Sequence, residues 1–411
     1  MKDTKTDKEA DIIEVKDGHE TVSMMEPLLI SEQSRHRPVL ADLAVELAAR
    51  SAGFYHSLPE GLATALADLV RSMNCYYSNL IEGHSTHPVD IEKALRNDYS
   101  TDSKKRNLQL EARAHIEVQL WIDKGGLSGN EASTEGICAL HQRFCEHLPE
   151  ELQWVKDPRT GKKIKITPGE LRKRDVQVGE HIAISPAVVP EFMKRFSNVY
   201  GRLGISETII ASAAAHHRLL WIHPFLDGNG RVARLMSHAM FLKTLDTGSI
   251  WSISRGLARN EAEYKKHLSA CDLTRRNDLD GRGNLSEEAL AAFTKFFLEV
   301  CLDQVDFMEQ LIKPDQLRTR ILLWVDEEIA LGKLPKPTKS ILEPILYRGM
   351  LPRSEVAGIL GASTRHARRV TEALSEFGII KSDTSRAPWK LVFPASLASR
   401  WMPGLFPEQT S

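Results

Sequence analysis

Hydrophobic residues recur every three or four positions along most of this chain, the spacing that places them on one face of an α-helix. In a helix predicted to end at Ile81, that face is formed by Leu62, Leu66, Leu69, Val70 and Met73. Gly83 follows at the point where such a helix ends. The same spacing predicts helices over about 107–122, 135–148 and 207–221.

The helical pattern is interrupted between residues 151 and 190, where glycine and proline are mixed with short β-favouring runs. The runs Val176–Val178 and His181–Ile184 flank a glycine, and this arrangement predicts a β-hairpin within an irregular loop. From 190 to 310 the pattern is helical again, with breaks at 227–230 and 246–249. These features predict a mainly α fold that carries a β-hairpin.

A different pattern begins after Pro314 and the stretch 334–337, whose two prolines predict a linker. Residues 338–395 contain three short helical patterns and two β-favouring runs, and their order resembles a winged helix-turn-helix domain. The third helix exposes Arg365, His366, Arg368 and Arg369. Residues 338–411 hold ten Lys and Arg against six Asp and Glu, a local charge of +4. We therefore expect this domain to bind either DNA or another protein.

Composition places the chain among ordinary globular proteins. Its 411 residues are 42% hydrophobic and 27% charged, with 54 Lys and Arg against 55 Asp and Glu. This balance excludes a mostly disordered or collagen-like chain, and any affinity for nucleic acid must be local. No apolar run reaches the length of about 18 residues that a membrane span requires. The five cysteines form no Cys-x-x-Cys pair, so neither a disulfide framework nor a cysteine zinc site is expected.

The first 20 residues carry four lysines and seven acidic residues, which predicts a mobile tail. They lack the apolar core of a signal peptide, so we expect a cytoplasmic protein with no membrane partner. We expect a tail over 1–37, a helical region over 38–125, a central domain over 126–312 and the C-terminal domain over 335–400. The sequence leaves the oligomeric state open, and a homodimer is compatible with it.

One stretch combines a helix break, a glycine turn and a new helix. It reads His-Pro-Phe-Leu-Asp-Gly-Asn-Gly-Arg-Val-Ala-Arg from His223 to Arg234. Pro224 favours a break after the preceding helix, and Gly228 and Gly230 allow a tight turn that a ligand can approach closely. The next helix starts at once, so the turn lies at a helix N-terminus, where free N–H groups attract anions.

The charged residues of this stretch suit chemistry on a polyphosphate. Arg231 and Arg234 are three positions apart, so both can add positive charge on one side of the helix. Asp227 is suited to hold a hard cation beside phosphates, and His223 is a base that titrates near neutrality. Together these groups supply the positioning and charge neutralisation that phosphoryl chemistry requires.

Alternative interpretations of this stretch are weaker. An EF-hand loop starting at Asp227 fails, because Arg231 and His238 would occupy its fifth and twelfth positions. A zinc site would need a different histidine spacing from that of His216, His217 and His223. The chain contains no P-loop sequence. A purely structural turn between two helices remains the simplest alternative.

The twelve positions resemble the signature of the Fic family, His-Pro-Phe-x-Asp/Glu-Gly-Asn-Gly-Arg-x-x-Arg, and every fixed position matches. The resemblance covers roughly residues 130–300 and implies a Fic helical core that transfers AMP from ATP to a hydroxyl side chain of a target protein. It implies that His223 is the general base and that Asp227 binds Mg²⁺. The nucleotide-binding residues that it implies here are Gly228, Asn229, Gly230, Arg231 and Arg234, with Arg234 on the γ-phosphate. Phe225 resembles the buried aromatic residue that anchors the loop.

Two further segments resemble parts of the family's nucleotide site. The predicted hairpin resembles the flap, which lines the nucleotide and pairs with the target's backbone. The flap residues so implied are Val176, Gln177, Val178 and Gly179. The stretch from Ser252 to Tyr264 resembles the segment that closes the adenine pocket, with Asn260 as the expected contact of the base. A helix start with a polar face explains this second stretch equally well.

An upstream segment resembles the family's inhibitory motif, Ser/Thr-x-x-x-Glu-Gly/Asn. Here Ser78 and Glu82 are four positions apart, and Gly83 follows. The resemblance implies that Glu82 pairs with Arg234 and occupies the place of the γ-phosphate. Taken alone, a glutamate before a glycine is an ordinary solvated helix end.

These observations predict a mainly α protein: a Fic helical core with a β-hairpin flap, plus a C-terminal winged helix domain. The expected function is a protein adenylyltransferase that uses ATP and Mg²⁺ and is autoinhibited by Glu82. One alternative is removal of AMP, with Glu82 aligning a water. Another is a DNA-binding regulator whose Fic core senses nucleotide; His223 argues against it, because a sensor needs no base.

Overall fold

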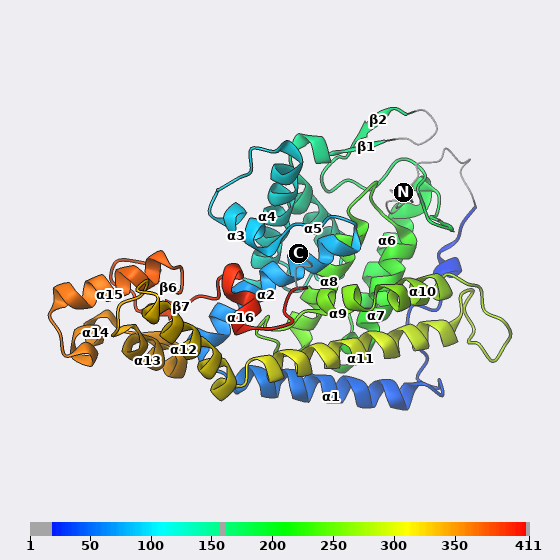
Figure 1. Cartoon of the computed structure of the whole chain (residues 1–411). Helices are drawn as coiled ribbons and strands as arrows, with labels where there is room; N and C mark the ends of the chain where they lie inside the picture. Colours follow the sequence, from blue (N-terminus) through cyan, green and yellow to red (C-terminus); the bar gives the residue numbers. More distant parts are fainter. Residues whose placement is uncertain (1–18, 157–160, 408–411) are drawn as a thin grey trace, which may run out of the picture. The chain divides into compact units, whose positions relative to one another are not determined.

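The computed structural model describes residues 19–156 and 161–407, and most of them lie in α-helices (Figure 1). The chain divides into two compact units by the contacts within it. Within the described residues, the first unit consists of 19–50, 74–156, 161–246 and 252–304. The second consists of 51–73, 247–251 and 305–407. These units do not coincide with the four consecutive parts expected from the sequence, because each unit combines segments that are distant along the chain.

Three long helices contribute residues to both units. They are α1 (Arg37–His56), α2 (Glu60–Ile81) and α11 (Glu287–Leu311). The remaining helices of the first unit are α3 (Pro88–Leu95), α4 (Ser103–Asp123), α5 (Thr134–Glu146), α6 (Val189–Tyr200), α7 (Ile205–Ile222), α8 (Asn229–Thr244), α9 (Ile253–Arg259) and α10 (Glu261–Cys271). Its short 3₁₀ helices are η1 (Val22–Met25), η2 (Glu150–Leu152) and η3 (Pro186–Val188). The helix ends predicted at Ile81, 122, 148 and 221 lie within two residues of the observed ends.

The centre of the first unit is the pair α7 and α8, which pack against each other along their lengths (Figure 1). Ala213, Ala214 and Ala215 of α7 are almost completely buried, and their small side chains let the two helices approach closely. Helices α4 and α5 cover α8, and α6 covers α7. The turn that joins α7 to α8 is therefore held by helices on several sides.

Two small antiparallel hairpins lie between α5 and α6, where the sequence predicted one hairpin. The first joins β1 (Trp154–Lys156) to β2 (Lys163–Lys165). The second is the predicted one and joins β3 (Gln177–Val178) to β4 (His181–Ile182), with Gly179 in the turn at φ +62°. The expectation of a mainly α fold with a hairpin is confirmed.

The expected mobile tail over 1–37 needs correction for its second half. Residues 1–18 lie outside the described residues, but Met25, Leu28 and Ile30 are buried in the first unit. The Arg195 guanidinium contacts Glu26 at 2.6 Å, and the Tyr200 hydroxyl donates to the Leu28 carbonyl at 2.6 Å. Apolar residues that follow the charged run thus fix this segment against α6.

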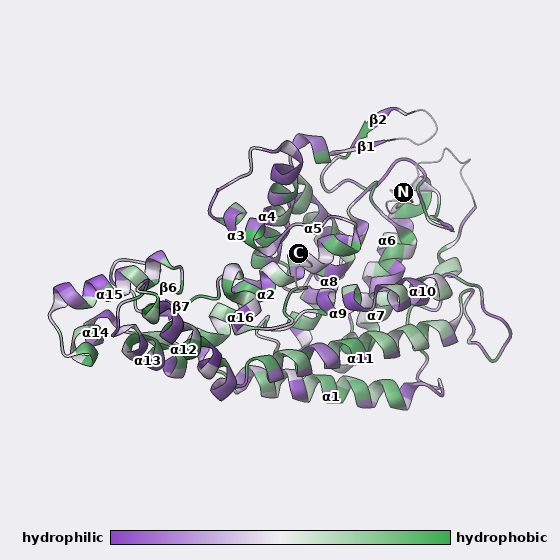
Figure 2. Cartoon of the chain, viewed as in Figure 1, coloured by the Kyte–Doolittle hydropathy of each residue, from purple (hydrophilic) through white to green (hydrophobic). Residues whose placement is uncertain are grey.

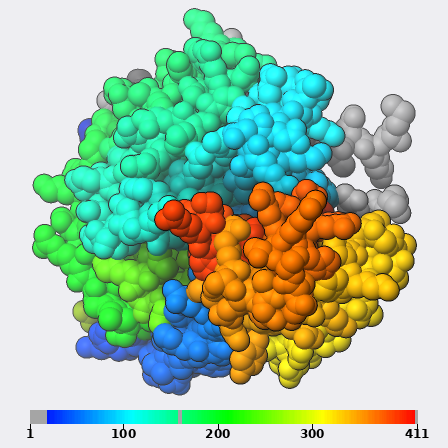
Figure 3. All heavy atoms as spheres, turned by 90° about the vertical axis from the view of Figure 1, so that its left-hand side faces the viewer, coloured from blue at the N-terminus to red at the C-terminus, as the bar shows by residue number. Residues whose placement is uncertain are grey.

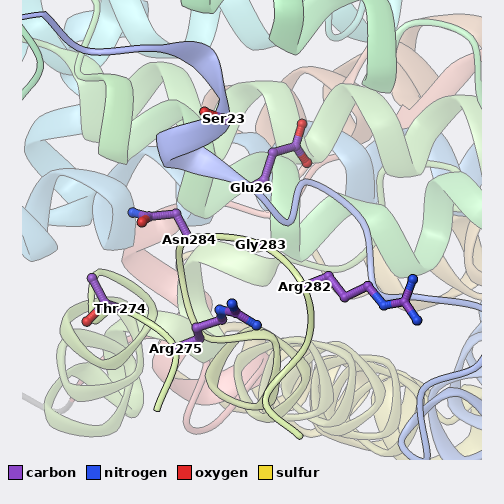
Figure 4. A pocket seen from close by; sticks show the side chains of 7 residues that line it. All are labelled: Ser23, Glu26, Thr274, Arg275, Arg282, Gly283 and Asn284. Carbon is purple, nitrogen blue, oxygen red and sulfur yellow. The ribbon is translucent and has the colours of Figure 1, made fainter. Parts of the chain in front are cut away.

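The helical pattern expected from 190 to 310 is also interrupted, by a polar loop over 272–286 between α10 and α11 that is purple in Figure 2. Asp280 organises it by accepting hydrogen bonds from the Ser286 hydroxyl at 2.9 Å and the Glu288 N–H at 2.8 Å. Together with Ser23 and Glu26, the loop lines a shallow pocket of 530 Å³ (Figure 4).

The second unit ends in a small α/β arrangement, whose surface is drawn in orange and red in Figure 3. Its helices are α12 (Pro314–Ala330), α13 (Thr338–Arg348), α14 (Arg353–Leu360), α15 (Thr364–Glu376) and α16 (Ala398–Trp401), with η4 at Ala395–Leu397. Its strands are β5 (Met350–Leu351), β6 (Ile380–Lys381) and β7 (Trp389–Leu391), in the sheet order β5-β7-β6. The sequence predicted the last two strands and missed β5, which is only two residues long.

Helix α15 starts at Thr364, because the Ser363 hydroxyl accepts a hydrogen bond from the His366 N–H and caps the helix. The expected linker at 334–337 is partly packed, since Leu334 is buried. All five cysteines are free; Cys138 is half-buried and the others are buried. None of the described helices combines the length and apolar character needed to cross a membrane; the expected location stays a prediction.

Candidate active site

The turn from His223 to Gly230 connects α7 to α8 and is braced from within. The chain leaves α7 at His223, which adopts a left-handed conformation with φ +50°. Phe225 is completely buried and stacks on the His141 imidazole with ring centroids 3.8 Å apart. The Asn229 side chain bonds both the N–H and the carbonyl of Phe225 at 2.9 Å. Phe225 thus anchors the loop as expected, and the Asn229 side chain shapes the turn.

The His223 imidazole is held in one tautomer. Its Nδ1 lies 3.2 Å from the Leu220 carbonyl oxygen, which can only accept, so Nδ1 carries the proton. Nε2 is left as the acceptor. Burial and the nearby Arg172 charge lower the pKa of His223 to about 4, below the near-neutral value expected from the sequence, and this keeps the ring neutral at pH 7. A neutral imidazole with a free Nε2 is the form that accepts a proton.

Arg172 ties together the segments around His223. Its Nε donates to the His223 carbonyl at 2.7 Å, and its backbone N–H donates to the Pro224 carbonyl at 2.8 Å. Its Nη2 reaches the carbonyl of Ile184, just beyond β4. The guanidinium is almost completely buried, and this burial lowers its pKa to about 10. Arg172 therefore fixes the loop of His223 relative to the β3–β4 hairpin.

The first turn of α8 is an anion site by geometry. Gly228 precedes it with φ +80°, a conformation that favours glycine. A side chain at Gly230 would reach the carboxylate of Glu82 and displace it. The carboxylate thus lies beside the first turn of the helix, where exposed N–H groups and the helix dipole favour negative charge.

Arg234 lies one turn further along α8, and its guanidinium contacts residues at the C-terminal end of α2. Its Nε donates to the Ser78 hydroxyl at 2.8 Å, its Nη2 donates to the Ser78 carbonyl at 3.0 Å, and Nη2 also pairs with Glu82. Burial alone would raise the pKa of Glu82, but Arg234 and Arg231 more than offset this and lower it. Ser78, Glu82 and Arg234 therefore meet, as the resemblance to the inhibitory motif implied.

Arg231 has a different set of partners. One end of its guanidinium pairs with the fully buried carboxylate of Glu111 on α4, and Nη2 lies 3.3 Å from Asp227. The guanidinium also lies over the Phe144 ring, 4.9 Å from its centroid. Burial raises the pKa of Asp227, but Arg231 and the Gly228 N–H reverse the effect and lower it. Asp227 is thus an ionised carboxylate, with its side chain about half exposed.

The predicted flap residues lie on the β3–β4 hairpin. Val176 is buried, Gln177 is half-buried, and Val178 and Gly179 are exposed. His181 Nε2 lies 2.8 Å from the Trp221 carbonyl, which attaches the hairpin to the end of α7. The hairpin is therefore fixed next to His223 while its edge stays open.

Asn260 is exposed at the junction of α9 and α10, and its side chain donates to the Gly256 carbonyl at 2.9 Å. Within the described residues, no hydrogen bond joins this side chain to the α8 turn. Its predicted role at the adenine is untested. The described residues likewise contain no cluster of three or more His, Cys, Asp or Glu able to hold a metal ion.

Three residues around the turn were not predicted from the sequence: Glu111, Arg172 and His84, whose Nδ1 lies 2.8 Å from the Glu111 carboxylate. Glu111 belongs to a stripe of buried polar residues on α4 that continues with His115 and Gln119, at steps of four. That spacing was visible in the sequence, but a polar stripe on a helix normally faces water. Arg172 lies in a loop among other charged residues, and no sequence pattern distinguishes it from these neighbours.

Comparisons with known proteins place the turn within a segment that matches a protein family. Residues 131–241 match the model of the Fic/DOC family, and this segment is a Fic/DOC domain. A protein adenylyltransferase Fic from Drosophila erecta is 28% identical over 170 residues, 41% of this chain and 31% of that relative. The corresponding protein of Culex quinquefasciatus is 27% identical over 194 residues, 46% of this chain and 35% of that relative. The match thus spans about a third of the length of these curated relatives.

A solved structure has a similar fold. A Fic family protein from Desulfovibrio desulfuricans aligns with 89% of this chain and 98% of its own, with a TM-score of 0.53 and 16% sequence identity. At that identity the likeness concerns the fold, which is mainly α as expected.

Proposed function

We propose that this chain is a protein adenylyltransferase that transfers AMP from ATP to a hydroxyl side chain of a target protein. The observation that carries the proposal is the turn between α7 and α8. It combines a neutral imidazole, the N-terminus of a helix and two buried arginines within one Fic/DOC domain. The curated relatives that carry the name protein adenylyltransferase support the same reaction class.

In the proposed reaction the target's hydroxyl oxygen attacks the α-phosphorus of ATP. The bond from that phosphorus to the bridging oxygen breaks, and pyrophosphate leaves. His223 Nε2 takes the hydroxyl proton. The α8 N-terminus and Arg231 hold the phosphates, and Arg234 receives the γ-phosphate. The open edge of the β3–β4 hairpin would pair with the target's backbone, and Asn260 would contact the adenine.

Asp227 fits the Mg²⁺ that such a nucleotide carries. Its carboxylate is ionised and half exposed at the phosphate turn, and Mg²⁺ is normally bound by one or two carboxylates together with phosphate oxygens. A bound Mg²⁺ would neutralise phosphate charge during transfer. This chain's part is to hold Asp227 in place through Arg231 and the Gly228 N–H.

We further propose that Ser78 and Glu82 make α2 an inhibitory helix. The Glu82 carboxylate pairs with Arg234 and lies against Gly230. It would therefore compete with the γ-phosphate for the same arginine. A nucleotide that binds beside Glu82 would have its α-phosphate out of line for attack. The inhibition is intramolecular in this proposal.

The experiment is AMP transfer from labelled ATP by wild-type protein and by Glu82→Gly. We expect Glu82→Gly to raise auto- or target-adenylylation by at least about tenfold, the effect of roughly 1.4 kcal/mol in population. Glu82→Gly combined with His223→Ala should abolish transfer yet still bind ATP. Glu170→Gly removes an exposed carboxylate from another loop of the same unit and serves as the control.

Two outcomes would replace this proposal. Glu82→Gly that leaves transfer unchanged but stops release of AMP from a modified substrate would show that the enzyme removes AMP, with Glu82 orienting the water. ATP binding with no transfer by wild type or Glu82→Gly would favour a nucleotide-sensing regulator.

We also propose that the α13–β7 segment is a winged helix domain that binds DNA. The supporting observation is the exposed face of α15, where Arg365 and Arg369 form no ion pair within the described residues, whereas Arg368 pairs with Glu372 at 2.7 Å. Unpaired arginines on such a helix are available for phosphates or base edges. The affinity of the full chain for DNA should fall as the salt concentration rises. The double change Arg365→Ala with Arg369→Ala should reduce the slope of log affinity against log salt concentration by about 1–2.

The matched control is Arg318→Ala on α12, which removes an exposed arginine that is paired with Glu343. It should leave DNA binding unchanged. If the full chain shows no salt-dependent DNA binding, the exposed face of α15 is instead a surface for another protein.

A further inference from the structure

Glu111 is a fully buried carboxylate whose two oxygens have different partners. Oε1 pairs with the Arg231 guanidinium, and Oε2 lies 2.8 Å from His84 Nδ1, two residues beyond Glu82. Glu111 comes from α4, outside the segment 131–241 that matches the family model. A buried charge needs a partner with good geometry, and Glu111 is the one that Arg231 contacts most closely.

The other contacts of Arg231 leave its guanidinium poorly fixed. Asp227 is 3.3–3.4 Å away at long hydrogen-bond distances. Phe144 provides only a stacking surface on one face. The Arg231 Nε is buried and has no hydrogen-bond partner within the described residues. The pair with Glu111 is therefore the contact that fixes the Nη1 end of the guanidinium, and the Nη2 end lies toward Asp227.

We propose that Glu111 is a positioning residue for AMP transfer: it fixes the orientation of Arg231, so that Arg231 meets the phosphates in the geometry that in-line attack requires. The inference rests on the proposed function. Glu111 does not touch the nucleotide in this proposal, and it acts only through Arg231.

A positioning role and a purely structural role have different signatures. If Glu111 only neutralises Arg231, its replacement lowers stability and leaves the transfer rate of the folded protein unchanged. If it orients Arg231, Glu111→Gln leaves the buried Arg231 guanidinium without its neutralising carboxylate and pointing in the wrong direction. ATP then binds at least as tightly as before, because the positive charge is less neutralised, while the α-phosphate is held out of line. The loss falls on kcat, not on ATP affinity.

The test compares Glu82→Gly with Glu82→Gly/Glu111→Gln, so that the inhibitory carboxylate does not mask the effect. We expect kcat to fall between about tenfold and a hundredfold, the loss that accompanies a displacement of about one ångström. The dissociation constant of ATP, measured by calorimetry, should be unchanged or lower. With Arg231→Ala already present, Glu111→Gln should change kcat less than about twofold, since the residue through which it acts is gone.

The matched control is Asp123→Asn. Asp123 also belongs to α4 and also pairs with a side chain of α8, contacting His238 Nε2 at 2.7 Å. It links the same two helices away from the phosphate turn. Asp123→Asn should lower stability and leave kcat and ATP affinity of the folded protein unchanged. If Glu111→Gln does not fold, Glu111→Asp replaces it, because its carboxylate is withdrawn by one methylene and should lower kcat in the same way.

A readout without transfer keeps the inference separate from the proposed function. The phosphorus NMR signal of the α-phosphate of bound ATP should shift between Glu82→Gly and Glu82→Gly/Glu111→Gln, and stay constant with Asp123→Asn. A shift without any transfer would refute the adenylyltransferase and still support the orientation of Arg231 by Glu111 at the bound nucleotide. An unchanged signal with unchanged kcat, or weaker ATP binding with unchanged kcat, would overturn the positioning role alone. Absence of ATP binding to Glu82→Gly would overturn both.

Discussion

The Arg172 guanidinium donates a hydrogen bond to the backbone carbonyl of His223 at 2.7 Å, across 51 positions of sequence. A second nitrogen of the same guanidinium lies 3.3 Å from the carbonyl of Ile222, the last residue of α7. One side chain thus satisfies the carbonyls at a helix end and holds the left-handed residue that carries the imidazole.

We predict that Arg172→Lys lowers AMP transfer by at least about tenfold in the Glu82→Gly background, since one ammonium group cannot replace the fork of the guanidinium. It should also lower the free energy of unfolding by about 1–3 kcal/mol, because a buried carbonyl loses its partner. Kinetics and denaturant titration check this. Lys173→Gln, at an exposed neighbour, is the control; equal effects of both changes would contradict the role of Arg172.

Asp227→Asn should weaken Mg²⁺-dependent transfer while leaving the turn folded, because Asn keeps an oxygen that can accept the Gly228 N–H but loses the charge. Excess Mg²⁺ should restore part of the rate, measured as transfer against Mg²⁺ concentration in the Glu82→Gly background. Full activity in the presence of EDTA would remove the metal from the proposed reaction.

Acid should destabilise the first unit through its buried histidines. Burial is the main cause that lowers the pKa to about 3 for His115 and His216, and to about 4 for His141, His217 and His223. The unfolded chain binds these protons at about pH 6.5, so stability is lost as the pH falls from about 6.5 toward 4. Each histidine contributes up to about 1.4 kcal/mol per pH unit. His115→Gln should reduce this slope in denaturant titrations; an unchanged slope would contradict the neutral, buried His115.

His84 should behave in the opposite way. Its hydrogen bond to Glu111 raises the pKa of His84 and outweighs the effect of burial. The charged pair therefore stabilises the fold fully below about pH 6.5, and this contribution is lost as the pH rises through the raised pKa. The stability difference between wild type and His84→Gln should be largest at pH 6 and shrink at higher pH. A difference that grows with pH would refute the charged pair.

The amino-acid sequence determined much of the local structure of this protein. The apolar spacing from Leu62 to Met73 and the glycine at 83 set the end of α2, and Ser363 set the start of α15. These are short-range effects, in which side chains a few positions apart share a helix face or cap a free N–H. The turn from His223 to Arg234 could be recognised for the same reason, since its break, its glycines and its arginines are consecutive.

The sequence was less informative where local patterns compete. The helical spacing from 190 to 310 hid the loop at 272–286, although Asn277, Asp278, Gly281 and Gly283 are residues that favour loops. The charged residues near the N-terminus likewise predicted a longer tail, although three apolar residues around Leu28 pack into the first unit.

Only the tertiary structure decided which buried charges meet. Glu111 is 120 positions from Arg231, and Glu82 is 152 positions from Arg234. The family resemblance anticipated the second pair, whereas nothing in the sequence pattern indicated the first. A polar stripe on α4 reads the same whether it faces water or an arginine, because the period of a helix defines its faces and not what covers them. The packing of α4 against α8 removes water from that stripe. Because an unpaired buried charge is costly, the buried carboxylate and guanidinium then form an ion pair.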